Sequence, residues 1–295
     1  MIETSELPMF ICDGDKVVAV SNNGEALGIV KPIHVDISTV SSVEINKITK
    51  SLAEALSYLH YKNIYLRSDI HQVNIFLTKS QNGETKALFK TDKMIGENEK
   101  NMEKMKEDHG YMANLLCFLW LCNTGSNSVG LNFTQEAFAD TLRYCDWEER
   151  SKWQIWKDVV FWSEEVVLDF FICASEILEL KQEKHRKAVE HNKEAVIGHS
   201  WLEELDPVLQ EKIKKDSVKR RTYDWSCCVD LLRVIRNLAS HYFNLTLEVR
   251  ATIGTYDQLA SYWISLYPRL LLHVFRAMEQ FKNDTNCLRI KKYYV

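Results

Sequence analysis

The chain has 295 residues, which is enough to bury a full core and to form two domains. Its composition, 46% apolar and 26% charged, is typical of a globular protein. The net charge of −4 excludes a globally basic nucleic-acid-binding protein, so any contact with nucleic acid requires a local basic patch. With four prolines and ten glycines, the chain has few turn-forming residues, and we expect helix to predominate.

The eight cysteines form no Cys-x-x-Cys pair and have no cysteine–histidine spacing suited to zinc. We therefore expect buried thiols in a reducing compartment and no metal site. No apolar run approaches about 18 residues, so no membrane-spanning segment is expected. These features predict a cytoplasmic protein that does not bind a membrane.

The first 122 residues predict strands and two helices. Residues 43–60 carry apolar side chains at helical spacing, and residues 110–122 are apolar on all sides, which is typical of a core helix. Between these two helices, residues 93–108 are highly charged and predict a mobile loop. Strands are predicted from β-branched residues and turn signals over six ranges, 9–12, 16–20, 26–30, 63–66, 74–78 and 86–89.

The rest of the chain predicts helices. Residues 131–180 indicate several short helices that carry four tryptophans, and residues 180–195 are polar enough to be a solvated helix or linker. A second helical unit is predicted from residue 198 to the C-terminus. Its last strong helix follows Pro268 and places five apolar side chains on one side: Leu271, Val274, Phe275, Met278 and Phe281.

The stretch from Tyr223 to Tyr242 contains the candidate catalytic residues. It sets Tyr223, Arg236, Asn237 and His241 within nineteen positions of an otherwise helical apolar pattern. A histidine gives or takes a proton near neutral pH, and a tyrosine makes the complementary transfer. Arginine and asparagine hold a phosphodiester and its developing negative charge. These four residue types can cleave RNA without a metal.

Helical geometry predicts how these residues lie. Asn237 and His241 are four positions apart and share a face, whereas Arg236 lies about 100° away and must reach back towards them. Tyr223 precedes the helix and must fold over its start. A buried stripe is predicted from four residues: Leu231, Ile235, Leu238 and Tyr242.

Residues 67–74, Arg-Ser-Asp-Ile-His-Gln-Val-Asn, resemble the catalytic-loop pattern His-Arg-Asp-Leu-Lys-Pro-x-Asn of a protein kinase C-lobe. Asp69 and Asn74 keep the family's aspartate and metal-binding asparagine, but the His, Arg and Lys are lost. Lys90 stands where the family has the aspartate of Asp-Phe-Gly. Phosphoryl transfer needs Mg²⁺ held on the nucleotide. The resemblance therefore implies a truncated pseudokinase lobe in which Asp69 and Asn74 are a vestigial nucleotide site, with ATP or ADP binding left open.

Further along, Val160-Phe-Trp-Ser163 resembles the His-Pro-Phe-Phe-Trp junction between a kinase lobe and the KEN endoribonuclease domain. That domain occurs in ribonuclease L and in the inositol-requiring unfolded-protein sensors of the endoplasmic reticulum. The resemblance is strongest over residues 230–242 and 266–278. It covers residues 158–282 well and residues 40–157 weakly.

The family's four active-site residues fall on Tyr223, Arg236, Asn237 and His241. The resemblance implies that Tyr223 assists removal of the ribose 2′ proton and that His241 protonates the departing 5′ oxygen. Arg236 and Asn237 would bind the phosphate, and cleavage would require no cofactor. The departures, Ser240 in place of a second His and the pair Asp224-Trp225, concern affinity and sequence preference more than chemistry.

A basic run lies just before Tyr223 and suits the backbone of a single-stranded RNA loop. The alternative is an ordinary solvated helix face. The residues expected to contact RNA are Lys215, Lys219, Arg220 and Arg221, with Lys212 and Lys214 in the same run.

Together, these patterns predict a mainly α chain. Residues 1–157 would form the reduced kinase-like lobe, with a little β structure at the N-terminus, and residues 158–295 an all-helical KEN-like ribonuclease domain. The predicted function is a metal-independent endoribonuclease acting on single-stranded or stem-loop RNA, as a homodimer or a heterodimer with a full-length relative. Two alternatives remain: a catalytically silent scaffold that regulates a related ribonuclease, and a nucleotide-binding switch.

Overall fold

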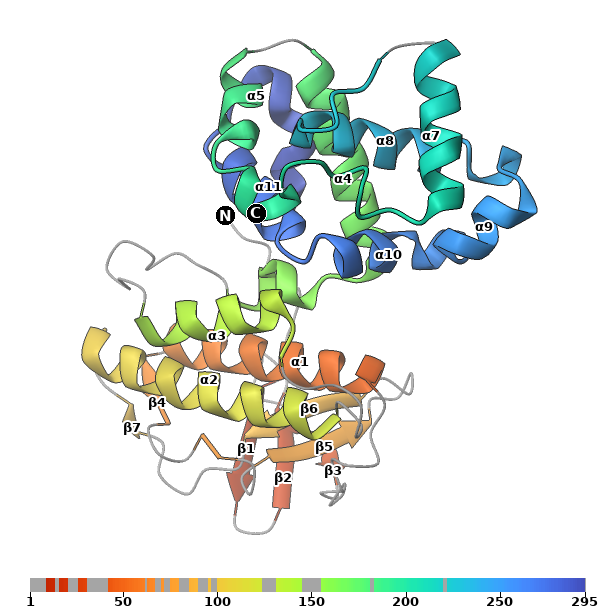
Figure 1. Ribbon diagram of the computed structural model, residues 1–295. Helices are drawn as coiled ribbons and strands as arrows, with labels where there is room; N and C mark the ends of the chain where they lie inside the picture. Colours follow the sequence, from red (N-terminus) through yellow and green to blue (C-terminus); the bar gives the residue numbers. More distant parts are fainter. Residues whose placement is uncertain are drawn as a thin grey trace. The chain divides into compact units, whose positions relative to one another are not determined.

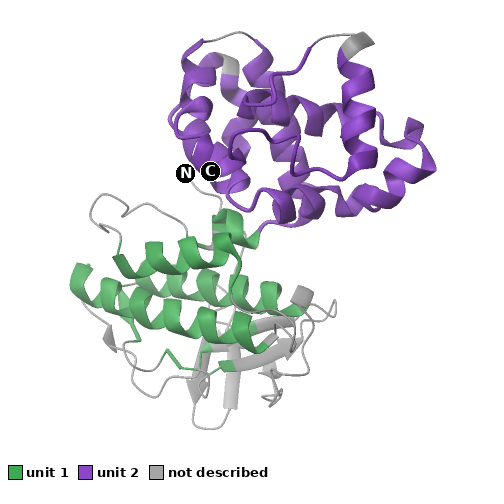
Figure 2. Ribbon diagram, in the orientation of Figure 1, with its two compact units in different colours: residues 1–161 green, residues 162–295 purple. Residues whose placement is uncertain are grey.

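The computed structural model divides into two compact units, residues 1–161 and 162–295 (Figure 2). The division follows Phe161, whereas the sequence placed it after residue 157. The structure describes the whole chain apart from residues 1–8, 14–15, 21–25, 31–41, 62, 67–69, 72–74, 80–84, 90–94, 97–99, 124–130, 145–154, 181–182, 220–221 and 295.

Unit 1 combines short antiparallel strands with a layer of helices (Figure 1). β1, β2 and β3 form a three-stranded sheet, and β4 pairs with β7 and β5 with β6. In Figure 1, α1, α2 and α3 run side by side. The elements in chain order are β1 (Met9–Asp13), β2 (Lys16–Val20), β3 (Ala26–Val30), α1 (Ser42–Tyr61), β4 (Ile64–Tyr65), β5 (Ile75–Lys79), β6 (Thr85–Phe89), β7 (Ile95–Gly96), α2 (Met102–Asn123), α3 (Phe133–Tyr144), η4 (Ile155–Lys157) and η5 (Val159–Phe161).

The core of unit 1 forms around α1, which buries one face because its apolar residues recur every three or four positions. β6 is attached to this helix by Ser51, whose hydroxyl accepts from the Ala87 backbone N–H (3.1 Å) and donates to the Ala87 carbonyl (3.2 Å). The buried residues on this face of α1 are Ile45, Ile48, Leu52 and Leu56.

The prediction of a mobile loop over residues 93–108 is wrong from residue 102 onward, because α2 begins at Met102. The side chain of Asn101 caps the helix by accepting from the Lys104 N–H at 3.1 Å. Asp108 is fully buried, and its carboxylate meets His60 Nε2 at 2.9 Å and the Leu66 N–H at 3.0 Å. A buried carboxylate with two partners makes this charged segment part of the core.

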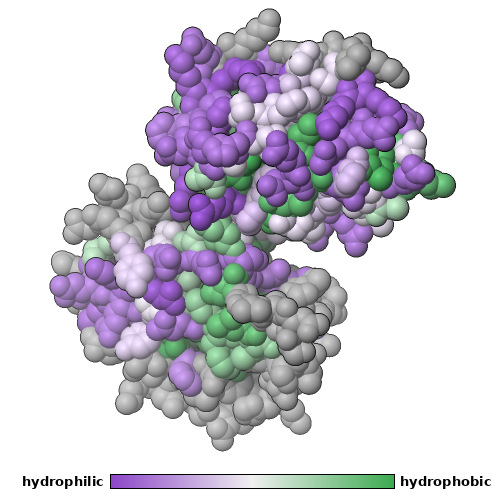
Figure 3. Space-filling view, viewed as in Figure 1, coloured by the Kyte–Doolittle hydropathy of each residue, from purple (hydrophilic) through white to green (hydrophobic). Residues whose placement is uncertain are grey.

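The second half of α2 is less buried than its apolar sequence predicts. Leu116 and Leu119 are fully buried, but Phe118 and Leu121 are exposed. Figure 3 shows hydrophobic residues gathered on the visible face of unit 1 over this part of α2. The apolar run over residues 110–122 therefore contributes side chains both to the core and to the surface of unit 1.

Unit 2 is helical throughout its described residues (Figure 1). The long helix α4 packs against α8, α10, α11 and η8, and α7 packs against α9. The elements are α4 (Glu164–Glu179), α5 (Glu183–Glu190), α6 (Glu194–Ile197), α7 (Pro207–Lys219), α8 (Cys228–Ser240), η6 (Tyr242–Asn244), α9 (Leu247–Ile253), η7 (Tyr256–Gln258), α10 (Leu259–Leu266), α11 (Leu270–Glu279) and η8 (Thr285–Tyr293).

Two predictions for this region need correction or refinement. The prediction of only short helices over residues 131–180 is wrong for α4, which has 16 residues and begins at a Ser163 side-chain cap. The prediction of a solvated helix or linker over residues 180–195 holds for the helix α5, but this helix also buries one side, since His185 and Val189 are both fully buried. The visible surface of unit 2 is mostly hydrophilic in Figure 3.

The fold is mainly α with a small β content at the N-terminus, which confirms the predicted fold class. Where the structure describes the chain, no helix has both the length and the apolar character needed to cross a membrane.

Candidate active site

Helix α8 supplies the frame of the candidate site. Leu231, Ile235, Leu238 and Tyr242 are all buried, which confirms the predicted stripe. The start of the helix is satisfied by Glu190 of α5, whose carboxylate accepts from the Val229 N–H at 2.8 Å. A carboxylate at a helix N-terminus complements unpaired N–H groups and the helix dipole. With one face fixed in the core, α8 holds its polar residues on the opposite side.

Two residues of α8 position Tyr223 over the start of the helix. Asp230 accepts from the Asp224 N–H at 2.8 Å, and the Arg233 guanidinium lies 4.3 Å from the centre of the Tyr223 ring. On the other side, Tyr223 donates its own backbone N–H to Ser217 of α7 at 3.2 Å. Asp230 and Arg233 also pair with each other at 3.0 Å and are both buried. Tyr223 therefore packs on α8 although it lies outside it.

A chain of hydrogen bonds joins three of the four predicted residues. The Asn237 side-chain amide donates to the Tyr223 hydroxyl at 3.0 Å, and Arg236 donates to the Asn237 carbonyl oxygen at 3.0 Å. Arg236 thus reaches back towards Asn237, as the helical geometry predicts. All three side chains are half-buried, so they are held firmly and still face solvent in part.

His241, the fourth residue, lies one turn after Asn237 at the end of α8, and its backbone N–H donates to the Asn237 carbonyl at 3.1 Å. The residue is exposed. Within the described part of the chain, its imidazole makes no hydrogen bond or ion pair. Both ring nitrogens are therefore accessible for proton transfer to a bound molecule.

Glu179 is a site residue that the sequence analysis missed. Its carboxylate receives two hydrogen bonds from the Arg236 guanidinium, at 2.5 and 3.1 Å. This bidentate pair is partly buried and offsets the positive charge of Arg236. Glu179 is 57 positions away in the chain, so no local spacing could have indicated it.

Two aromatic residues beside His241 were also missed. Phe243 is 78% exposed and stacks on Tyr256, with ring centres 6.1 Å apart and planes inclined by 15°. The neighbouring Tyr242 is anchored because its hydroxyl donates to the Gly254 carbonyl at 2.7 Å. The available signal was a phenylalanine two positions after the predicted histidine, outside the apolar stripe.

The described residues of the basic run lie on α7 and are partly neutralised. Lys215 pairs with Glu211 at 2.7 Å, and Lys212 pairs with Asp216. Lys214 is exposed. Lys219 ends α7, and its side chain lies outside the described part. Arg220 and Arg221 lie outside the described residues altogether, as do Asp69 and Asn74 of the kinase-like pattern.

The four candidate side chains do not form a metal-ligand set, since only His241 among them is a common ligand. In the described part of the chain, one group of side chains has donor atoms close enough to hold a metal: His185, Asp284 and Cys287. It shares no member with the candidate active site.

Comparison with known proteins identifies the domain. A family model described as Ribonuclease 2-5A matches residues 167–294. The human serine/threonine-protein kinase/endoribonuclease IRE2 is 35% identical over 128 residues, which are 42% of this chain and 13% of that protein. The Caenorhabditis elegans serine/threonine-protein kinase/endoribonuclease ire-1 is 33% identical over 137 residues, which are 45% and 13% of the two chains.

A third relative, the Schizosaccharomyces pombe sensor for unfolded proteins in the ER ire1, is 33% identical over 125 residues, 41% of this chain and 11% of its own. The matched segments thus span only 11–13% of the length of these relatives. The family match nevertheless contains Tyr223, Arg236, Asn237 and His241. Residues 167–294 therefore form a KEN-type domain of the ribonuclease 2-5A family.

Proposed function

We propose that this chain is a metal-independent endoribonuclease that cleaves single-stranded or stem-loop RNA by attack of a ribose 2′-hydroxyl. The observation that carries the proposal is the hydrogen-bond chain from Arg236 through Asn237 to Tyr223, one helical turn before an exposed His241. The names of the relatives, which include endoribonuclease, support it.

The proposed reaction forms one bond and breaks one. The 2′ oxygen bonds to phosphorus while its proton moves to the Tyr223 oxygen, which has first given its own proton to solvent. The bond from phosphorus to the 5′ oxygen breaks, and this oxygen takes a proton from the His241 imidazolium. The products are a 2′,3′-cyclic phosphate and a 5′-hydroxyl. General acid–base assistance contributes a factor of about 10² to 10⁴.

Asn237 and Arg236 divide the task of holding the phosphate. One amide hydrogen of Asn237 is donated to Tyr223, which leaves the second for a phosphate oxygen. Arg236 fixes the orientation of that amide through its carbonyl oxygen. Because Glu179 occupies two guanidinium hydrogen bonds, Arg236 acts first as a positioning residue and only then as a source of charge.

The substrate class, an unpaired loop, is supported by the exposed aromatic pair. An exposed ring beside the phosphate site offers a stacking face to an unpaired base, and stacking of this kind contributes about 1–3 kcal/mol per base. Phe243, supported from beneath by Tyr256, is two residues from His241. The exposed lysines of α7 would attract the phosphodiester backbone next to it.

The decisive test is cleavage of a fluorescent RNA stem-loop by the purified chain in EDTA. Wild type should cut and leave a 2′,3′-cyclic phosphate, and His241→Ala should lose at least about 10²-fold in rate. His191→Ala, at an exposed histidine of the same unit, is the matched control and should cut normally. Full activity of His241→Ala in a folded protein, or cleavage that requires added Mg²⁺, would refute the proposal.

Dimerisation is part of the proposal and rests on the resemblance alone, as does the kinase-like character of unit 1. The cytoplasmic location proposed for the chain rests on its cysteine pattern and apolar runs. A dimer requirement predicts that the cleavage rate per chain rises with protein concentration. Sedimentation measured over the same concentrations should show the dimer appearing in parallel, as either a homodimer or a complex with a full-length relative.

A silent scaffold is the second candidate, and the Glu179–Arg236 ion pair favours it. A guanidinium already paired with a carboxylate attracts phosphate less strongly. The scaffold predicts that wild type binds a related ribonuclease and changes its rate, yet cuts no RNA at concentrations where the chain is dimeric.

A further inference from the structure

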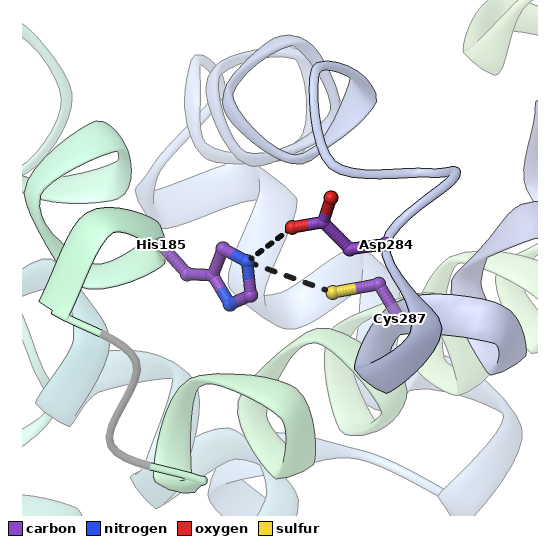
Figure 4. A group of neighbouring side chains, drawn as sticks. All are labelled: His185, Asp284 and Cys287. Atoms are coloured by element: carbon purple, nitrogen blue, oxygen red, sulfur yellow. Dashed lines mark hydrogen bonds and ion pairs between the residues drawn. The ribbon is translucent and has the colours of Figure 1, made fainter.

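Three metal-type ligands converge in unit 2, at a place that the nuclease proposal does not use (Figure 4). His185 projects from α5, while Asp284 and Cys287 come from the start of η8. His185 Nε2 lies 3.2 Å from Asp284 Oδ2 and 3.8 Å from Cys287 Sγ. The three donor atoms all lie within 4.8 Å of one another.

Backbone geometry and one aromatic contact bring His185, Asp284 and Cys287 together. In a 3₁₀ segment, side chains three positions apart lie above one another, so Asp284 and Cys287 share one side. The Cys287 N–H donates to the Asp284 carbonyl at 2.8 Å, which fixes that turn. His185 is held opposite them by Phe281, whose ring centre lies 4.3 Å from that of the imidazole. Cys287 and His185 are both fully buried.

The separations of His185 Nε2 from the other two donor atoms match a tetrahedral zinc site. Zinc binds sulfur at about 2.3 Å and nitrogen or oxygen at about 2.1 Å, so tetrahedral angles separate N from O by about 3.4 Å and S from N by about 3.6 Å. The observed separations, 3.2 and 3.8 Å, differ from these by a few tenths of an ångström. We propose that His185, Asp284 and Cys287 bind one Zn²⁺ ion, with water as the fourth ligand.

The types of donor favour zinc over the other common biological cations. A thiolate and an imidazole select zinc and similar transition metals, whereas Mg²⁺ and Ca²⁺ prefer sites made of oxygen alone. A thiolate and a carboxylate neutralise the two charges of the ion. Asp284 is 34% exposed at its side chain, which gives the ion and its water an entry route.

Two protonation changes accompany binding. Burial, together with the Asp284 charge, raises the pKa of the Cys287 thiol, so zinc must displace that proton. Lys184 now donates to Asp284 Oδ2 at 2.5 Å and would have to leave that oxygen. Its side chain is 58% exposed, so it is able to swing into solvent. The ligand nitrogen would be Nε2, because Asp284 and Cys287 both lie on that side of the ring.

The proposed site is structural. It would connect α5 to η8 across about 100 positions of the chain and would leave the hydrogen-bond chain around Asn237 untouched. Binding of an ion to the folded state alone adds about 2.7 kcal/mol at 100 times its dissociation constant. Zinc should therefore raise the melting temperature of the chain without taking part in the cleavage step.

The test is titration of metal-stripped full-length chain with Co²⁺, which reports thiolate and tetrahedral coordination by its absorption, followed by competition with Zn²⁺. Wild type should bind one ion per chain, show thiolate-to-cobalt charge transfer and melt higher with Zn²⁺. Cys287→Ser should lose the charge-transfer band, and His185→Gln should bind at least tenfold more weakly. Where either buried variant fails to fold, Asp284→Asn, at the partly exposed ligand, takes its place.

Two matched controls use the same residue types elsewhere: Cys122→Ser at an exposed thiol and His191→Gln at an exposed imidazole. Both should bind as wild type does. The proposal fails if wild type binds no Co²⁺ stoichiometrically, or if Cys287→Ser keeps the charge-transfer band. These readouts do not use RNA, so their failure leaves the ribonuclease proposal standing, and loss of cleavage in His241→Ala does not affect them.

Discussion

Unit 2 contains two polar clusters that differ in what their groups face. Around Asn237, the side chains are half-buried and bonded to one another, and His241 next to them is exposed. Around Cys287, an imidazole and a thiol are fully buried and converge on a single point. The first arrangement leaves hydrogen-bond donors for an external molecule, whereas the second is able to hold only something as small as an ion.

The two clusters also differ in what supports them. The first depends on charged groups packed under Tyr223, chiefly the buried pair of Asp230 and Arg233. The second depends on a turn of backbone and one aromatic ring, Phe281. Substitutions of the buried residues under the first cluster should therefore lower both folding stability and cleavage rate. Substitutions of its solvent-facing residues should alter only cleavage or RNA binding.

The largest effect is expected on folding stability, from Arg233→Met. This change leaves the buried Asp230 carboxylate without its ion-pair partner and removes the guanidinium from the face of the Tyr223 ring. Removing one partner of a buried pair costs about 3–5 kcal/mol of unfolding free energy. Urea unfolding measures it. Arg289→Met breaks an exposed ion pair with Glu176 and should cost at most about 1 kcal/mol, so equal costs would contradict the comparison.

Asn237→Ala should come next. It removes the donor to Tyr223 and the acceptor of Arg236, and with them the amide hydrogen that we propose binds the phosphate. Loss of one such donor lowers kcat by about 10²- to 10³-fold. Steady-state kinetics on the stem-loop measure it, with circular dichroism to check the fold. Asn283→Ala, at an exposed asparagine beside the other cluster, is the control, and equal kinetics for the two variants would count against the site.

Glu179→Gln is expected to have a smaller effect and to strengthen RNA binding rather than weaken function. The change removes the carboxylate charge that neutralises Arg236, so RNA should bind more tightly, with KM falling by about fivefold, or about 1 kcal/mol. Binding should also become more dependent on salt. Glu176→Gln, one turn earlier on α4 and paired with Arg289, is the matched control. An unchanged KM would mean that Arg236 does not contact the phosphate.

The smallest expected effect is a loss of folding stability at acidic pH. Hydrogen bonds from the backbone N–H and the hydroxyl of Ser226 lower the pKa of Asp224 below its ordinary value of 3.8. A lowered pKa in the folded chain contributes stability above pH 3.8, and this is lost as the pH falls through the folded value. Asp224 is exposed, so solvent screening keeps the contribution below about 1 kcal/mol.

Asp224→Asn tests this, because it removes the titration and keeps an oxygen acceptor for Ser226. The difference in unfolding free energy between wild type and this variant should be measurable at pH 7 and should shrink below pH 3.8. A difference that is constant with pH would show that the carboxylate charge does not stabilise the turn beside Tyr223.

The arrangement of the candidate residues around α8 could be predicted because they lie close together in the sequence. One helix fixes the angle between Asn237 and His241, and its apolar stripe fixes which face is buried. The core face of α1 followed from the same helical periodicity, and the strands of unit 1 followed from local β-branched residues and turn signals. A local sequence pattern was therefore sufficient wherever all the residues of a predicted feature lie in one helix or strand.

Features that depend on contacts distant in sequence could not be predicted. Glu179 meets Arg236 across 57 positions, and Asp284 meets His185 across 99, so no spacing indicates either pair. The spacing of cysteines and histidines likewise does not indicate that Cys287 lies beside His185, 102 positions away. The charged start of α2 was misread because the burial of Asp108 depends on His60 of α1 and on Leu66 just after β4, which no helix pattern in its own segment reveals.

The position of Glu190 has one more consequence. This residue ends α5, the eight-residue helix that carries His185, and its carboxylate holds the Val229 N–H and the Cys227 thiol at the start of α8. This short helix therefore carries His185 near its start and anchors the first turn of α8 at its end. Zinc bound at His185 would hold α5 more firmly and, through Glu190, would also stabilise the start of α8.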